Sequence, residues 1–305
     1  MILFASAVLA VMLGMATANA DAQTPSAIAG TGCSLRIDST GANWIIPGYD
    51  PFSGNASTAT FDVLFFNDGD RECRFRPVFM TDGTPFGLQA GTGRRVGYTL
   101  LDTWGQYDAT PLGGRTIVRI TNRPVVISAG AQQLVRYVLN VAAAELPGDG
   151  LYSQRLVMEA DQVDGTPIAS RQVVVGIQVL PAAMMGLAGA FRRNGSEADV
   201  DLGDLQPGIV PVPLALQVRS TRGYRLGVQS LNGGRLRLAG TDWTIAYDLQ
   251  IDGRTVALSG NATLSFGQGG GLRADALPMV FRIGEVSAQR AGVYADTLTV
   301  SVAVE

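Results

Sequence analysis

Short runs in which apolar and polar residues alternate cover most of this sequence, and they limit its possible folds more than any other feature. Residues 61–65 and 298–304 alternate, and residues 173–179 are rich in β-branched side chains, as a buried strand would be. Turn-forming pairs such as Asn232-Gly233 separate the runs. The best helical candidate, residues 134–144, is rich in valine and suits a strand better. The pattern predicts an all-β protein of the sandwich type.

The chain also contains an internal repeat. Residues 150–156 are similar to residues 292–298, and the strand-like residues 136–139 ahead of the first copy have a counterpart at residues 279–282. At roughly 150 residues per domain, a chain of 305 residues has room for two domains. The repeat therefore predicts two related β-domains.

The expected boundaries follow from this repeat and from the start of the chain. We expect a signal peptide at residues 1–20, a first β-domain at residues 21–180, a linker at residues 181–187 and a second β-domain at residues 188–305. The alternative for the linker is an apolar turn inside one domain.

Residues 1–20 have the pattern of an export signal. Residues 2–15 are apolar and uncharged, and Ala18-Asn19-Ala20 forms a small-residue cleavage pattern. An uncleaved membrane anchor is the alternative. We expect cleavage and a mature protein outside the cytoplasm, where disulfides persist. Cys33 and Cys73 are then expected to form a disulfide, with two free thiols as the alternative.

Composition argues against most chemistry that needs charged or metal-binding groups. Histidine is absent, and 23 basic residues stand against 26 acidic ones, for a net charge of −3. The lack of histidine removes His-based triads and His metal ligands. The net charge argues against binding nucleic acid through its phosphates. No acidic cluster has the pattern of an EF-hand calcium loop. We therefore expect no catalytic residue, no metal and no cofactor.

Five segments together resemble the spore coat protein U domain. Its opening is similar to Cys33-Ser34-Leu35 followed by the turn Tyr49–Gly54, and its later strands are similar to residues 222–234 and 245–249. The most specific match is Ala291–Val300, which resembles the closing Ala-Gly-x-Tyr-x-Asp-Thr-Leu-x-Val motif of that domain. The resemblance covers nearly the whole mature chain, although the second domain lacks the first cysteine of the family.

The resemblance implies a secreted subunit of an archaic chaperone–usher pilus, which serves surface attachment and biofilm formation. Such a subunit is an immunoglobulin-like sandwich that lacks its final strand. A periplasmic pilus chaperone fills the gap first. A strand from a neighbouring pilin subunit replaces the chaperone during assembly at the outer-membrane usher. On this basis the second domain is incomplete, and Leu298, Val300, Val302 and Val304 line its open groove. The alternative is an ordinary terminal strand within a complete sandwich.

Residues 21–32 are poorly suited to act as a donor strand for another subunit. Ile28 is their only large apolar side chain, and Pro25, Gly30 and Gly32 weaken a strand. One buried anchor contributes only about 1.5–3 kcal/mol, which is too little for a stable fibre joint. We expect this chain to accept a strand and to donate none, at the pilus tip, with its first domain facing outward.

In such a tip subunit the first domain would bind a host or abiotic surface through apolar loop tips. The candidates are Trp44, Phe86, Leu88, Trp104 and Tyr107. The alternative for each is a place in the core. Two other classes of protein stay open: a structural fibre or coat subunit without an adhesive role, and a secreted carbohydrate-binding sandwich.

Overall fold

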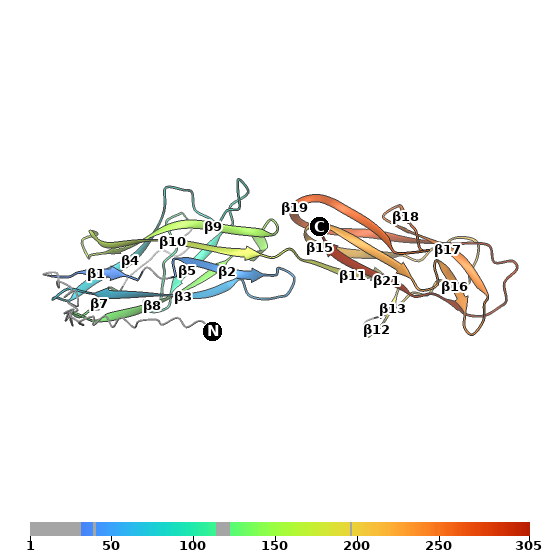
Figure 1. Ribbon diagram of the computed structural model, residues 1–305, viewed down its shortest axis with the longest axis horizontal. Coiled ribbons are helices and arrows are strands. Elements are labelled where there is room, and N and C mark those ends of the chain that lie inside the picture. The colour runs from blue at the N-terminus through green and yellow to red at the C-terminus, as the bar shows by residue number, and fades with distance from the viewer. Residues whose placement is uncertain (1–31, 39–40, 114–122, 196) are drawn as a thin grey trace, which may run out of the picture.

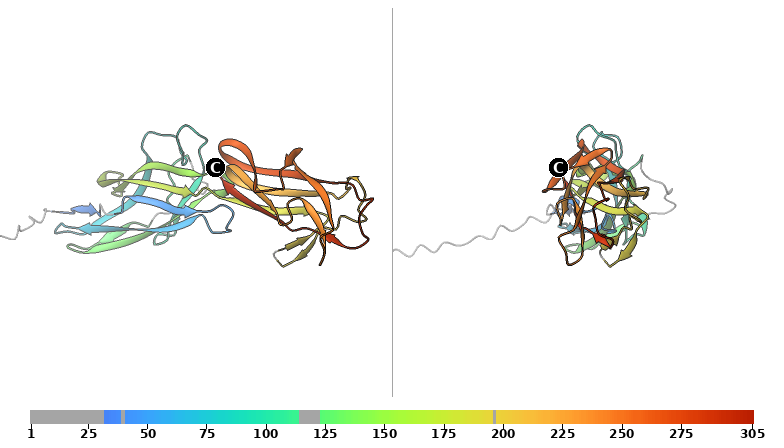
Figure 2. Two further views of the ribbon diagram at one scale, coloured as in Figure 1. Left: turned by 45° about the vertical axis from the view of Figure 1, so that its right-hand side comes forward. Right: turned by 90° about the vertical axis from the view of Figure 1, so that its right-hand side faces the viewer.

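Two β-sandwiches follow each other along the chain and lie end to end (Figures 1 and 2). The computed structural model describes residues 32–38, 41–113, 123–195 and 197–305. The expected signal peptide and residues 21–31 lie outside this range. In the described part of the chain the helical content is one 3₁₀ turn, η1 (Ala143–Glu145), and no helix is long and apolar enough to cross a membrane. The prediction of an all-β sandwich protein is confirmed.

The first sandwich consists of two five-stranded sheets. One sheet has the order β1 (Leu35–Ile37), β3 (Thr58–Asn67), β8 (Gln132–Val141), β5 (Tyr98–Asp102), β6 (Tyr107–Asp108). The other has the order β2 (Asn43–Tyr49), β10 (Pro167–Val179), β9 (Gly150–Asp161), β4 (Cys73–Thr81), β7 (Val125–Ile127). In the second of these sheets β10 lies between β9 and β2. It is hydrogen-bonded to both, antiparallel to β9 and parallel to β2.

The second sandwich is built around two long strands. The path through its sheet is β11 (Ala183–Gly189), β15 (Leu214–Ser230), β19 (Ala262–Ile283), β17 (Thr244–Ile251), β16 (Arg235–Leu238), β20 (Tyr294–Ala295). Three further strands join it, namely β14 (Gly208–Ile209), β18 (Arg254–Val256) and β21 (Leu298–Val304). A separate ribbon pairs β12 (Arg192–Asn194) with β13 (Glu197–Asp199).

The sheet of the second sandwich folds over into two layers, and strands β15 and β19 each run through both layers. Residues 214–220 of β15 pair with β11, whereas residues 224–230 pair with β21. The ladder between β15 and β19 shifts register at Ser220–Tyr224, where both strands bend at the end that faces the first sandwich (Figure 1). A Cβ atom at Gly223 would lie 2.8 Å from the carbonyl oxygen of Gly267, so only glycine allows the two bends to come this close.

Each sandwich has its own hydrophobic core. In the first, the rings of Trp44, Phe79 and Tyr137 pack against one another with centroids 5.1–5.8 Å apart. In the second, Tyr224 stacks on Phe266 at 5.4 Å. Inward side chains alternate with exposed ones along β3, β8 and β15, which is how the period-two pattern of the sequence becomes two packed layers.

The disulfide is confirmed, and the linker is shorter than expected. Cys33 and Cys73 are bonded, which ties the chain ahead of β1 to the start of β4. Residues 183–187, expected to be part of a linker, instead belong to β11 and pair with β15. The apolar pattern of Met185 and Leu187 is therefore that of a strand, and only Pro181 and Ala182 stand between Leu180 and the second sandwich.

Candidate functional site

The second sandwich has an open seam between the edge strands β11 and β21. Strand β11 pairs with one half of β15, and β21 pairs with the other half. The two edge strands lie side by side without pairing with each other. Among the described residues, no strand occupies the second edge of either one. We call this space, lined by residues 183–189 and 298–304, the seam.

Apolar side chains from both strands face the seam and are only half buried. Leu298, Val300 and Val302 pack against the core of the second sandwich from β21, and Met185 and Leu187 do so from β11. Val304, the fourth residue expected in the groove, is also half buried. Their neighbours across the ladder, such as Leu226, are fully buried. The core is therefore covered where β21 pairs with β15 and only half covered at the unpaired edge of β21.

The first sandwich shows what closes such a seam. The hydroxyl of Tyr152, near the start of β9, donates a hydrogen bond to the carbonyl oxygen of Gly148 at 3.2 Å. The hydroxyl of Tyr294, just ahead of β21, donates in the same way to the carbonyl oxygen of Arg290, four residues upstream, at 2.9 Å. This tyrosine corner marks β9 and β21 as equivalent strands and gives the sequence repeat a structural counterpart. Strand β9 has β10 on its second side, and β21 has no equivalent among the described residues.

The start of β21 is fastened by the carboxylate of Asp296. Its Oδ2 accepts hydrogen bonds from the hydroxyls of Ser230 at 2.5 Å and Tyr247 at 2.7 Å. Its Oδ1 accepts from the backbone N–H groups of Asn232 at 3.0 Å and Thr297 at 2.8 Å. Burial, and then the bond to Asp296, raise the pKa of the Tyr247 hydroxyl well above its ordinary value. These residues come from three of the segments that carry the family resemblance, so the segments meet at one site.

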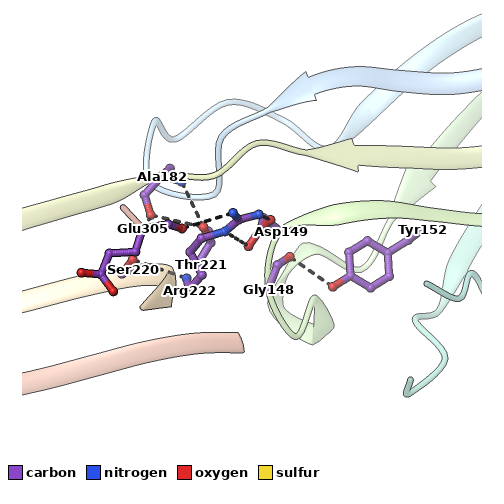
Figure 3. Close-up of polar contacts among 8 residues, drawn as sticks. All are labelled: Gly148, Asp149, Tyr152, Ala182, Ser220, Thr221, Arg222 and Glu305. Carbon is purple, nitrogen blue, oxygen red and sulfur yellow. Dashed lines mark hydrogen bonds and ion pairs between the residues drawn. The ribbon is translucent and has the colours of Figure 1, made fainter. Parts of the chain in front are cut away.

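The far end of β21 reaches the junction between the two sandwiches (Figure 3). There Nε of Arg222 donates to Oδ1 of Asp149 at 2.9 Å, and Nη2 of Arg222 donates to Oδ2 of Asp149. The ion pair is therefore bidentate. A further nitrogen of Arg222 donates to the carbonyl oxygen of Glu305 at 3.2 Å. The Asp149 side chain is 7% exposed and the Arg222 side chain 35% exposed, so this partly buried pair joins the first sandwich to the end of the seam.

Two further contacts surround this ion pair. The backbone N–H of Leu272 donates to the carbonyl oxygen of Pro147. The guanidinium of Arg219 lies 5.5 Å from the ring centroid of Phe52, in the Tyr49–Gly54 turn that the sequence singled out. With a linker of only two residues, these contacts restrain the angle between the sandwiches.

We expect the junction to loosen when Asp149 is protonated. Hydrogen bonds from Arg222 hold the pKa of the Asp149 carboxyl below its ordinary value. A depressed pKa means that the stabilisation is present at neutral pH and is lost as the pH falls through that lowered pKa. Asp149→Asn should reproduce the acid state at neutral pH. It should broaden the distribution of distances between spin labels placed one on each sandwich.

The matched control is Asp164→Asn. The pKa of Asp164 is also lowered, by hydrogen bonds from Thr166, but this residue lies in the β9–β10 turn at the other end of the first sandwich. Equal broadening in both variants, or none in Asp149→Asn, would show that the ion pair does not hold the junction.

The structure places most of the expected loop-tip residues in the core. Trp44 is 2% exposed, Leu88 0% and Tyr107 8%, so the prediction that they project from loops is wrong for all three. Their neighbours in other strands cover them, as the hydrogen bond from the Tyr107 hydroxyl to the carbonyl oxygen of Pro77 illustrates. Phe86 is partly buried and packs against the core. Trp104 is 37% exposed.

The backbone at Trp104 is fixed by the hairpin between β5 and β6. Oδ1 of Asp102 accepts hydrogen bonds from the backbone N–H groups of Trp104 and Gly105, each at 2.8 Å. The guanidinium of Arg123 lies 5.6 Å from the Trp104 ring centroid. The backbone at Trp104 is thereby fixed, and part of its ring stays accessible to solvent.

Sequence reasoning missed the contribution of β11 and the role of Asp296. The alternation of Met185 and Leu187 was a usable signal for β11, and the motif Tyr-x-Asp-Thr contained Asp296. In the described ranges, no group of three or more Asp, Glu or Cys residues lies close enough together to hold a metal ion.

No family model matches this chain, and no curated protein matches it. Solved structures with a similar fold include the CupB6 tip adhesin from Pseudomonas aeruginosa, with 12% identity over 88% of this chain and 94% of that one, at a TM-score of 0.37. They also include the CsuC–CsuE chaperone–tip adhesion subunit complex from the archaic chaperone–usher Csu pili of Acinetobacter baumannii, with 13% identity, coverage of 89% and 99%, and a TM-score of 0.42. A third is CfaE, the adhesive subunit of CFA/I fimbria of enterotoxigenic Escherichia coli, with 10% identity, coverage of 85% and 91%, and a TM-score of 0.35. At these identities the likeness concerns the arrangement of strands alone.

Proposed function

We propose that the second sandwich accepts a β-strand from another polypeptide, and that the protein is thereby anchored in a pilus. The observation that carries this proposal is the seam, where two edge strands with free backbone groups flank a row of half-buried apolar side chains. An open edge of this kind aggregates unless it is covered. A strand added there gains backbone hydrogen bonds from β21 and apolar contacts from both sheets.

The polarity of the added strand follows from the first sandwich. Strand β10 runs antiparallel to β9 and parallel to β2. By the same arrangement, a strand in the seam would run antiparallel to β21 and parallel to β11. In this proposal a periplasmic chaperone covers the seam before assembly, and a neighbouring pilin subunit supplies the strand at the outer-membrane usher.

The test is to produce residues 21–305 in a periplasm with and without the pilus chaperone from the same genome. We expect aggregation or degradation without the chaperone and a soluble one-to-one complex with it. Amide hydrogens of residues 298–304 should exchange slowly only in the complex, because the open edge frays in its absence. A stable monomer with slowly exchanging β21 amides in the absence of any partner would contradict the proposal.

We further propose that the protein lies at the pilus tip and serves attachment and biofilm formation. Residues 21–32 contain one large apolar side chain and would make a weak donor strand. The first sandwich pairs its own strand β10 with β9 and needs no strand from a partner to cover that edge. It is then free to bind a host or abiotic surface, and Trp104 is the residue best placed to do so among the five expected from the sequence.

Trp104→Ala is expected to reduce the attachment of piliated cells to surfaces severalfold while leaving the fold intact. Truncating a partly exposed loop side chain should change the stability by less than about 1 kcal/mol. Adhesion assays and thermal unfolding of the chaperone complex measure the two effects. Leu112→Ala, at a side chain that is 77% exposed, is the control for loss of apolar surface alone. Equal adhesion by the two variants would remove Trp104 from the binding surface.

A further inference from the structure

The junction between the two sandwiches shows how a strand leaves a completed sandwich and enters the next one. Strand β10 completes the first sandwich, Pro181 and Ala182 follow, and β11 begins the second. The corner ahead of β9 contacts that next sandwich directly (Figure 3). A Cβ atom at Gly148 would lie 3.0 Å from the carbonyl oxygen of Thr221, so the corner and the second sandwich are in van der Waals contact.

The second sandwich carries the same corner at its opposite end. Tyr294 bonds to the carbonyl oxygen of Arg290 as Tyr152 bonds to that of Gly148, so Arg290 occupies the place of Gly148. Strand β21 starts beside this corner and ends at Glu305, at the junction. A strand antiparallel to β21 therefore leaves the seam at the corner end, as β10 leaves the first sandwich at its corner end.

The surface around this second corner is apolar and accessible. Val293 is 82% exposed and Leu231 is 76% exposed. The backbone N–H of Leu231 donates to the carbonyl oxygen of Thr297, which holds it next to the corner segment. Both apolar side chains lie near the exit of the seam and are open to contact with a partner.

Arg290 adds a charge to this surface. Its guanidinium lies 5.1 Å from the ring centroid of Trp243. No carboxylate of the described residues lies within ion-pair distance of it. A shallow pocket of about 440 Å³ lies beside it, lined by Thr241, Asp242, Trp243, Thr244, Gln289 and Arg290. The guanidinium of Arg290 stacks on an aromatic ring and has N–H donors to spare, so it is suited to bind a carboxylate of a partner.

We propose that the corner surface, formed by Leu231, Trp243, Arg290 and Val293, docks the folded domain of the same polypeptide whose strand fills the seam. This inference rests on the proposed function. The partner is a β-sandwich subunit that places apolar side chains on Leu231 and Val293 and a carboxylate on Arg290. Within this chain the Gly148 corner packs against the second sandwich. The proposed contact is the equivalent one between two polypeptides, at the Arg290 corner.

The test uses the full-length protein in the cells that make the pilus, with the photo-crosslinker benzoylphenylalanine in place of Val293, Ser301 or Leu134. Ser301 is exposed on β21 beside the seam, and Leu134 is an exposed control on the outer face of the first sandwich. We expect positions 293 and 301 to capture the same polypeptide, identified by mass spectrometry. Position 301 should capture its extended N-terminal segment, position 293 should capture its folded domain, and position 134 should capture neither.

The outcomes separate the two proposals. Capture at 301 without capture at 293, or capture of a different polypeptide at 293, would overturn the docking surface and leave strand addition standing. Capture at neither position would overturn both. Arg290→Glu should lower the yield of the 293 cross-link about fivefold through charge repulsion and leave the 301 cross-link unchanged. The control Arg155→Glu, at an exposed position on the first sandwich, should change neither.

Discussion

Replacing Val302 by aspartate is expected to abolish capture of the second sandwich by the chaperone and by a donor strand. Val302 lies opposite the fully buried Leu226 and packs against the core from the edge of the seam. A strand added to β21 would bury the new carboxylate without a partner, which costs about 3 kcal/mol or more. The affinity should fall on the order of a hundredfold or more, measured by co-purification and titration of the complex. Val300→Asp should behave alike.

Ser301→Asp is the matched control. Ser301 lies next to Val302 on the same strand but is exposed. The same charge on this side should stay in water and change the affinity little. If Ser301→Asp weakened the complex as much as Val302→Asp, the effect would be one of charge on β21 and not of burial in the seam. An unchanged complex with Val302→Asp would mean that no strand enters there.

Removal of the Asp296 carboxylate is expected to detach the start of β21. Asp296→Ala leaves four donors without their acceptor, among them the Ser230 and Tyr247 hydroxyls. Hydrogen bonds to a charged acceptor contribute about 1.5–3 kcal/mol each, and their losses overlap because they share one group. We expect a loss of about 3 kcal/mol in the second sandwich. Hydrogen exchange of residues 298–304 in the chaperone complex should report it.

Two variants test the geometry of this site. Asp296→Asn keeps an acceptor for the backbone N–H groups and should lose about half as much stability as Asp296→Ala. Asp248→Ala removes an exposed carboxylate next to Tyr247 on β17 and should leave β21 exchange unchanged. Faster exchange throughout the first sandwich of Asp296→Ala would contradict the separation of the two cores.

The positions and inward faces of strands can be predicted from the sequence, because they depend on residues that are neighbours in the chain. Alternation over residues 61–65 and 298–304 identified β3 and β21 and the faces they present. The two cysteines, in a chain expected to be exported, predicted the disulfide. The internal repeat places Met185 and Leu187 in a linker between the two halves, whereas pairing with β15 places them in β11.

Burial at individual positions was harder to predict. Leu88 follows a turn in the sequence and Trp44 lies in a strand-like position; both are candidates for loop tips, yet strands remote in the chain cover them. Trp44 contacts Phe61, Phe79 and Tyr137, which arrive from three other strands. Only the packed fold brings those strands together.

The amino-acid sequence alone predicts the strands, their inward faces, the disulfide and the presence of two related domains. Each of these depends on local periodicity, on residue type or on an internal repeat. The tertiary structure decided which strand edges are paired and which are open. An edge is open or closed according to contacts between segments far apart in the chain, as where β11 and β21 meet opposite halves of β15. The seam, the Asp296 site and the two tyrosine corners exist only once those distant segments have come together.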